Sequence, residues 1–207
     1  DVALDGDGNV YVSDTGNKRV RVYDPNGNFL RDIGSAGSGL GQLDEPSGLA
    51  VDPVERRLYV ADTWNQRISV FGLDGTPQFT FAVRGWYEDL GNRPYLAIDT
   101  TRHLVYVTDP DAGRVLVYDL QGNCVGSFGQ PSDTPADTTQ FDTVGGIAVD
   151  ADGNVYVADS AAGRVMKFAP FVDTILPLPQ NDQADNAGVP FLPGEATEEI
   201  TPEVGAG

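Results

Sequence analysis

The sequence predicts an all-β protein assembled from repeated four-stranded units. A motif at residues 9–24 returns at residues 57–72, 104–119 and 154–169, and every copy places Tyr-Val before an Asp that is followed five positions later by Arg. The four Asp residues lie between 47 and 50 residues apart. The copies are rich in β-branched and turn-forming residues and lack a sustained helical period. A period of this length indicates a repeat architecture.

Each unit begins with a short apolar segment that ends in Asp. These segments occupy residues 2–5, 49–52, 96–99 and 147–150, and the small Ala in their second position favours a strand that other strands approach closely. A turn leads into the Tyr-Val segment, where Val10 and Val12 flank Tyr11. Because alternate residues of a strand point to opposite faces, both faces of this second strand are apolar and both must be covered.

The third and fourth strands complete the unit. The third strand is expected at residues 19–23, 67–71, 114–118 and 164–168, and a Gly-containing turn then leads to a fourth strand at residues 29–34, 78–83 and 124–129. In the last unit only residues 172–176 are a candidate for this strand. Four-stranded antiparallel sheets with two apolar faces stabilise each other by packing face to face, and their radial stacking is a β-propeller.

The composition divides the chain into two parts. Residues 1–170 are expected to form the blades, with repeats at about 1–34, 48–83, 95–129 and 146–170. Residues 171–207 form an irregular acidic tail with seven acidic residues, five prolines and no basic residue. Such a segment buries too little apolar surface to offset its ordering entropy. Its apolar stretches, residues 175–178 and 189–192, are expected to contact the propeller or a partner.

The connector before the second unit carries a family resemblance. Residues 35–52 read SAGSGLGQLDEPSGLAVD, and this entry, together with the Tyr-Val, Asn and Arg positions of the units, resembles the NHL repeat family over about residues 1–170. The third and fourth units depart from the pattern, with Ala112 and Ala162 near the positions of Asn17 and Asn65. The resemblance implies a propeller that commonly has six blades. An arc with open ends would expose two apolar faces, so we expect four blades of a larger propeller rather than a closed four-bladed ring.

Charge and cysteine usage exclude several classes of protein. The net charge of −18 and the isoelectric point of about 4.1 argue against nucleic-acid binding, which depends on Lys and Arg neutralising phosphate. The single Cys124 cannot form an internal disulfide. The chain has no apolar run near the roughly 20 residues that span a bilayer, so we expect no direct membrane span. Because it begins at Asp1 inside a repeat, we expect a fragment or a processed product.

The repeated Asp and Arg residues are interpreted as ion pairs that fix the loop between the second and third strands. All four units carry both residues, whereas a functional site requires asymmetry among the copies. A ring of carboxylates lining a site is the alternative interpretation. The pairs are Asp14 and Arg19, Asp62 and Arg67, Asp109 and Arg114, and Asp159 and Arg164.

Catalytic and metal-binding patterns are weak, and we predict no catalytic residue, metal or cofactor. The turns at residues 5–9 and 150–154 resemble the start of a calcium loop but lack its later ligands. His103 is the only His, whereas zinc sites need three or four His or Cys ligands. Some propellers related to the NHL repeat family are enzymes, and two groups of them are relevant. The sequence lacks the set of His ligands that amidating lyases use to bind zinc. A lactonase-like propeller with a metal in the central channel remains an alternative.

The candidate binding surface lies on the side of the propeller where the loops between second and third strands meet the connectors between units. Trp and Arg are enriched at binding hot spots, and both Trp residues fall beside the second unit. The predicted contact residues are Trp64, Asn65, Trp86, Tyr87 and Arg93. The alternative is that Trp64 or Trp86 packs over the edge of the blade.

We therefore expect a non-enzymatic module that binds or scaffolds protein partners. Two alternatives stay open: a propeller enzyme of the lactonase or lyase type, and a structural subunit anchored by its C-terminal tail in a larger assembly. The NHL resemblance and the acidic tail favour an extracytoplasmic or cell-surface location, with a membrane-associated assembly as one setting.

Overall fold

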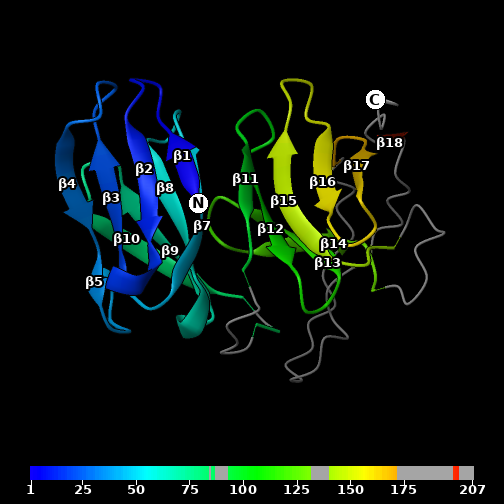
Figure 1. Cartoon of the computed structure of the whole chain (residues 1–207), viewed down its shortest axis with the longest axis horizontal. Coiled ribbons are helices and arrows are strands. Elements are labelled where there is room, and N and C mark those ends of the chain that lie inside the picture. Colours follow the sequence, from blue (N-terminus) through cyan, green and yellow to red (C-terminus); the bar gives the residue numbers. More distant parts are fainter. Residues whose placement is uncertain (84, 87–92, 132–139, 172–197, 201–207) are drawn as a thin grey trace, which may run out of the picture.

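Sixteen of the described strands form four sheets in chain order. A computed structural model of the chain describes residues 1–83, 85, 86, 93–131, 140–171 and 198–200. Each sheet has four antiparallel strands arranged consecutively from first to fourth. This confirms the predicted all-β, blade-based fold (Figure 1).

The first two blades follow the predicted units closely. Blade 1 contains β1 (Val2–Leu4), β2 (Val10–Asp14), β3 (Arg19–Tyr23) and β4 (Phe29–Ile33). Blade 2 contains β7 (Pro46–Asp52), β8 (Arg57–Asp62), β9 (Arg67–Gly72) and β10 (Pro77–Ala82). Between them, β5 (Ser35–Ala36) and β6 (Gln42–Leu43) form a small parallel pair that the sequence pattern did not predict.

The last two blades repeat the same order. Blade 3 contains β11 (Leu96–Asp99), β12 (Leu104–Asp109), β13 (Arg114–Asp119) and β14 (Cys124–Phe128). Blade 4 contains β15 (Val144–Val149), β16 (Val155–Asp159), β17 (Arg164–Phe168) and β18 (Glu198–Ile200). Short 3₁₀ turns at Thr15–Asn17 and Thr63–Asn65 join the second and third strands of blades 1 and 2.

The fourth strand of blade 4 lies within the segment predicted as an irregular tail. β18 pairs antiparallel with β17, and Val165 lies opposite Ile200 in the register. Residues 172–176, the candidate for this strand from the sequence, lie outside the described residues. The last strand is therefore supplied by a stretch that follows β17 only after a long interval in sequence.

Three hydrophobic clusters hold neighbouring blades together. The second-strand tyrosines Tyr11, Tyr59 and Tyr106 are fully buried, and each joins the cluster shared with the following blade. The aliphatic residues on either side of each Tyr face the preceding blade, as Leu58 and Val60 do towards blade 1. We call the Tyr side of a blade its forward face and the opposite side its backward face.

The first strands are neighbours along the inner side of the arc. Contacts join β1 to β7, β7 to β11 and β11 to β15. Figure 1 shows these four strands near the middle of the molecule, with β4 and β18 towards its two outer sides. The small Ala50 and Ala97 are buried between adjacent blades, as the close approach predicted from the sequence requires.

Gly48 tests how tightly the inner strands pack. A Cβ atom at Gly48 would overlap the carbonyl oxygen of Pro94 and lie 2.9 Å from the Cα of Tyr95, both backbone atoms of the following unit. Overpacking against backbone costs about 1–3 kcal/mol, so Gly48→Ala should lower the free energy of unfolding by that amount in denaturant titrations.

Gly146 provides the matched control, because it occupies the same position in β15 and a Cβ there would meet no atom of the described residues within 4 Å. Gly146→Ala should leave stability unchanged or raise it slightly, since Gly weakens a strand interior. Equal losses at both positions would contradict this account of the inner packing.

Candidate binding face

The loops between second and third strands share one side of the propeller with the connectors between blades. The backbone N–H of Trp64 donates to the carbonyl of Asp44, and the Thr15 hydroxyl donates to the carbonyl of Pro46 over 2.7 Å. In blade 4, the guanidinium of Arg164 donates to the carbonyl of Gln140. We call this side, built from these loops and connectors, the connector face.

All four predicted Asp–Arg ion pairs are present. The nitrogen–oxygen distances are 2.8 Å for Arg19 and Asp14, 2.7 Å for Arg67 and Asp62, 2.8 Å for Arg114 and Asp109, and 3.0 Å for Arg164 and Asp159. The carboxylates of blades 2 to 4 are fully buried, whereas that of Asp14 is 23% exposed. These pairs join the end of the second strand to the start of the third in every blade.

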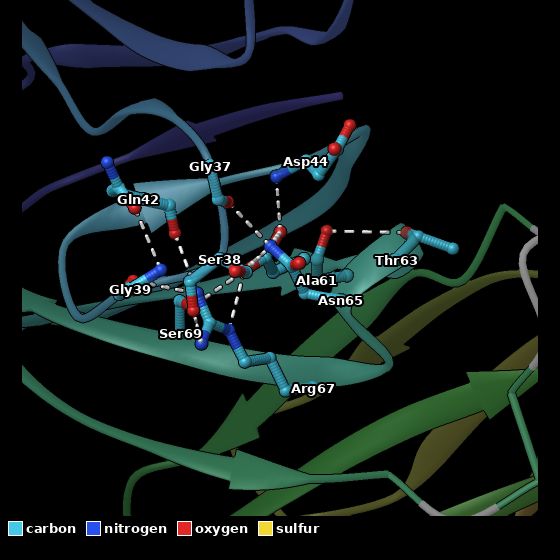
Figure 2. Close-up of polar contacts among 11 residues, drawn as sticks. Gly37, Ser38, Gly39, Gln42, Asp44, Ala61, Thr63, Asn65, Arg67 and Ser69 are labelled. Atoms are coloured by element: carbon cyan, nitrogen blue, oxygen red, sulfur yellow. Dashed lines mark hydrogen bonds and ion pairs between the residues drawn. The ribbon is translucent and has the colours of Figure 1, made fainter.

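Asp62 shows how such a pair also fixes a connector (Figure 2). Its carboxylate accepts hydrogen bonds from the backbone N–H of Asp44 at 2.6 Å, the side-chain amide of Asn65 and the hydroxyl of Ser69. Arg67, its ion-pair partner, donates to three backbone carbonyls of the connector, those of Ser38, Gly39 and Gln42. The charged pair therefore positions the backbone of residues 38–44.

The equivalent acids differ in their connector partners. Asp159 accepts hydrogen bonds at 3.0 Å from the backbone N–H groups of Asp142 and Thr143. Among the described residues, Oδ1 of Asp109 has no hydrogen-bond partner. Burial raises the pKa of the Asp109 carboxyl, and the neighbouring Arg114 acts in the opposite direction.

The predicted contact residues separate in the structure. Trp64 is half-buried, whereas Trp86 is 1% exposed and belongs to the cluster between blades 2 and 3. Trp86 is therefore a packing residue, as in the alternative interpretation of the sequence, and its indole is not available to a partner. Arg93 is exposed, and Asn65 is committed to Asp62 and the carbonyl of Gly37. Tyr87 lies outside the described residues.

Trp64 and Arg93 stand next to the two ends of one short chain of hydrogen bonds. The hydroxyl groups of Thr63 and Ser47 are 2.8 Å apart, and the Ser47 hydroxyl also lies 3.4 Å from the carbonyl oxygen of Pro94. Trp64 follows Thr63 and Arg93 precedes Pro94 in the sequence. The loop of blade 2 and the connector to blade 3 are therefore joined by this chain of hydrogen bonds, and Trp64 and Arg93 adjoin its two ends in the sequence.

Two further residues of this face escaped sequence reasoning. Lys18 forms an ion pair with Asp44 at 2.7 Å, which links the loop of blade 1 to the connector of blade 2. Tyr95 is 38% exposed at the entry to blade 3. Lys18 adopts a left-handed backbone with φ of 56°, as Gln66 does in blade 2. Because both residues directly precede the repeated Arg, an alignment of the two loops could have placed Lys18 on this face.

On the opposite side of the propeller, four Asp-containing turns have carboxylates that accept hydrogen bonds from within the turn. In the turns at Asp5, Asp24, Asp119 and Asp150, one oxygen accepts backbone N–H groups two and four residues later. The other oxygen accepts the side-chain amide of an Asn, as Asp150 does from Asn154 at 2.8 Å. The calcium-like turns therefore use their acids to close hairpins.

These turns predict a loss of stability in acid. The hydrogen bonds from Asn28 hold the pKa of Asp24 below the usual 3.8, and those from Asn154 act likewise on Asp150. A lowered pKa in the folded state stabilises the fold above the unfolded value, and this contribution disappears as the pH falls through the folded value. Unfolding midpoints should therefore decrease below about pH 4. Asn154→Ala should flatten this dependence, and an unchanged pH profile would contradict it.

The described residues offer no ready metal centre. No group of three or more His, Cys, Asp or Glu side chains among them is arranged to hold a metal ion. His103 is exposed in the turn between β11 and β12. No helix among the described residues is long and apolar enough to cross a membrane.

The blades and their connectors define a β-propeller of NHL type, and comparison with family models agrees. The model for the SMP-30/gluconolactonase/LRE-like region matches residues 1–138, and that for the NHL repeat matches residues 141–168. The chain belongs to the SMP-30/gluconolactonase/LRE-like family. The resemblance to NHL repeats is thereby confirmed.

Curated relatives are much longer than this chain. Peptidyl-glycine alpha-amidating monooxygenase A of Xenopus laevis is 31% identical over 179 residues, which cover 82% of this chain and 19% of that protein. Protein brain tumor of Drosophila melanogaster is 27% identical over 130 residues, covering 62% of this chain and 12% of that protein. The chain thus spans about a fifth or less of the length of these two relatives.

Solved structures share the fold. A streptogramin B lyase superposes with a TM-score of 0.59 at 14% identity, over 81% of this chain and 50% of that one. A structure of the nidogen/laminin complex gives a TM-score of 0.60 at 22% identity, over 81% and 58%. At these identities the likeness shows the fold alone. The chain covers about half of each solved structure.

Proposed function

We propose that this chain is a protein-binding module whose contact surface is the connector face beside blades 2 and 3. The observation that supports the proposal is that half-buried Trp64 and exposed Arg93 directly adjoin Thr63 and Pro94 in the sequence, and that Ser47 links these two residues by hydrogen bonds. Trp and Arg are the side chains most enriched at binding hot spots, and a fixed support lowers the entropy lost on binding.

The electrostatics of the face support binding over catalysis. The repeated carboxylates of blades 2 to 4 are buried and bonded to arginines and connector N–H groups, so they serve the loops rather than a substrate. Of the residues between Asp62 and Arg67, Thr63 is buried, Trp64 and Asn65 are half-buried, and Gln66 is exposed. The net charge of −18 favours a partner with a basic surface.

Substitutions at Trp64 and Arg93 test the proposal. Proteins captured by the purified chain from its native source should be lost with Trp64→Ala and weakened with Arg93→Ala, at unchanged melting temperature. Arg56→Ala is the matched control, because Arg56 is also exposed but lies in a turn on the opposite side of the propeller. Identical capture by all variants would rule out the connector face as the contact surface.

An enzyme of lactonase or lyase type is the second candidate. The family match over residues 1–138 and the fold shared with the streptogramin B lyase favour it. Its test is turnover of lactones and cyclic depsipeptides in the presence of added divalent metals, together with metal analysis of the purified chain. A metal-free protein without turnover would remove this candidate.

The third candidate is a structural subunit that is anchored by residues 171–207. The observation in its favour is that β18, which lies in this segment, pairs with β17 and completes blade 4. Removal of residues 201–207 retains β18, whereas removal of 171–207 deletes it. If every association persists in both truncated chains, the anchoring role is refuted.

A further inference from the structure

The fourth strand of blade 4 joins its sheet by a route that the other three blades do not use. In blades 1 to 3 the third and fourth strands are joined by hairpin turns at residues 24–28, 73–76 and 120–123. A backbone hydrogen bond closes each turn, as from the N–H of Asp119 to the carbonyl of Asn123 at 2.9 Å. In blade 4, Ala169 and Pro170 follow β17 in place of such a turn, and β18 begins only after residues 169–197. β18 therefore binds β17 as a tethered segment and not as half of a hairpin.

The pairing along the outer edge of β17 is regular. In blades 1 to 3 a β-bulge interrupts the register between the third and fourth strands, and the fourth-strand residues left without a register partner are Leu30, Gln78 and Val125. The three residues of β18 pair with Val165, Met166 and Lys167 without a bulge. A bulge is particular to its own pair of strands, whereas a regular ladder requires only an extended backbone from the added strand. The edge of β17 is therefore suited to strands other than β18.

The side chains of β17 give this edge a fixed base and one charge. Met166 is fully buried in the cluster between blades 3 and 4, and all five residues of β17 pair with β16, so β17 is held independently of its outer neighbour. Lys167 is half-buried, with its ammonium nitrogen 5.6 Å from the centre of the Tyr156 ring. When a strand is added to a sheet, backbone hydrogen bonds give affinity and the side chains beside the edge give selectivity. The charge of Lys167 favours an added strand with acidic residues.

The short pairing of β18 makes it a competitor that a longer strand can displace. β18 pairs with three of the five residues of β17, whereas the fourth strands of blades 1 to 3 pair at four or five positions. A covalent tether presents its strand at an effective concentration in the millimolar range at most, and this concentration falls as the linker lengthens. A partner strand that pairs along the whole of β17 can therefore replace β18.

We propose that the outer edge of β17 is a binding site for an extended strand of a protein partner, and that β18 occupies this site as a displaceable strap of the same chain. The partner strand adds to blade 4 in the antiparallel orientation that β18 adopts. It needs an extended backbone without proline over the paired positions and acidic residues near Lys167. This site is separate from the connector face, so neither proposal depends on the other.

Cleavage between β17 and β18 tests the strap in the complete chain. A protease site inserted between Gln180 and Asn181 allows the folded chain to be cut, and the probe is a fluorescent synthetic peptide of residues 194–201. The cut chain should exchange its own C-terminal piece for this peptide. The uncut chain should bind the peptide at least about tenfold more weakly, because the tethered strand competes for the same edge. Fluorescence anisotropy measures binding, and hydrogen exchange at the N–H groups of β17 locates it.

Proline variants of the peptide separate strand pairing from other modes of binding. The N–H groups of neighbouring strand residues point to opposite edges, so at least one of Glu199→Pro and Ile200→Pro removes a ladder hydrogen bond and should abolish binding. Ala196→Pro is the matched control, because it lies outside the three paired residues, and it should retain the affinity.

Four outcomes would overturn the proposal. The first is a cut chain that keeps its C-terminal piece through repeated dilution, and the second is equal peptide binding by the cut and uncut chains. The third is a cut chain that loses its fold in circular dichroism, because β18 would then be a permanent part of blade 4. The fourth is a dimer of the uncut chain that the free peptide dissociates, since a second copy would then supply the strand. Peptide binding that leaves hydrogen exchange on β17 unchanged would equally rule out this edge.

Discussion

Tyr59→Ala is expected to lower the free energy of unfolding by about 3–5 kcal/mol, the range found when large buried aromatic residues are cut to alanine. Tyr59 is fully buried between blades 2 and 3, where it packs in a cluster with Val105, Val107 and Leu116. Its removal leaves a cavity at a contact between sheets, where neither sheet can close the gap without moving as a unit. Chemical denaturation with matched m-values measures the loss.

Two controls separate packing from hydrogen bonding. Tyr59→Phe removes only the hydroxyl, which lies 3.4 Å from the carbonyl oxygen of Leu120, and should cost about 0.5–1.5 kcal/mol. Tyr156→Ala alters the same position in blade 4, where the Tyr side chain is only half-buried, and should cost less than Tyr59→Ala. A Tyr156 effect as large as that of Tyr59 would mean that burial between blades does not set the cost.

The blades could be predicted because their signals are local and repeated. Alternation of Tyr with aliphatic residues fixes the two faces of the second strand, and the same alternation occurs in four copies. The Asp–Arg pairs were also accessible, since the residues on either side of a short loop meet where two adjacent strands begin and end. In each case a single repeat contains all the information.

Features that depend on contacts between distant segments could not be predicted from the sequence. β18 lies far from β17 in sequence, and its three residues carry no pattern that separates them from the surrounding acidic stretch. The depth of Trp86 depends on how blades 2 and 3 pack, which no property of its own segment records. The sequence therefore predicted Trp86 as a contact residue, whereas its indole is part of the core between blades 2 and 3.

The connectors explain how a repeated framework presents a variable surface. Arg67 and Asp62 bind the backbone of residues 38–44 through carbonyl and N–H groups, so the side chains of that connector are left free to differ. Asp159 and Arg164 bind residues 140–143 in the same manner. Constant charged pairs thus hold loops whose sequences vary between blades, and this variation is where we place binding.

Arg67→Met should destabilise the chain by about 3–5 kcal/mol, because it leaves the fully buried carboxylate of Asp62 without its counter-ion. The substitution also removes the donors to the carbonyls of Ser38, Gly39 and Gln42, so the connector loses its attachment to β9. Denaturant unfolding measures the global loss. Hydrogen exchange at the backbone N–H of Asp44, which donates to Asp62, reports the connector directly.

Arg19→Met is the matched control, because it removes the equivalent cation from a pair whose side chains are 32% and 23% exposed. Solvent screens such a pair, so its loss should cost much less than the loss of the buried pair. The difference between the two variants measures the combined effect of burial and of the connector hydrogen bonds of Arg67, since Arg19 pairs with Asp32 instead. If Arg67→Met and Arg19→Met cost the same, or if exchange at Asp44 is unaffected, the pair does not fix the connector, and the argument for a rigid connector face loses its basis.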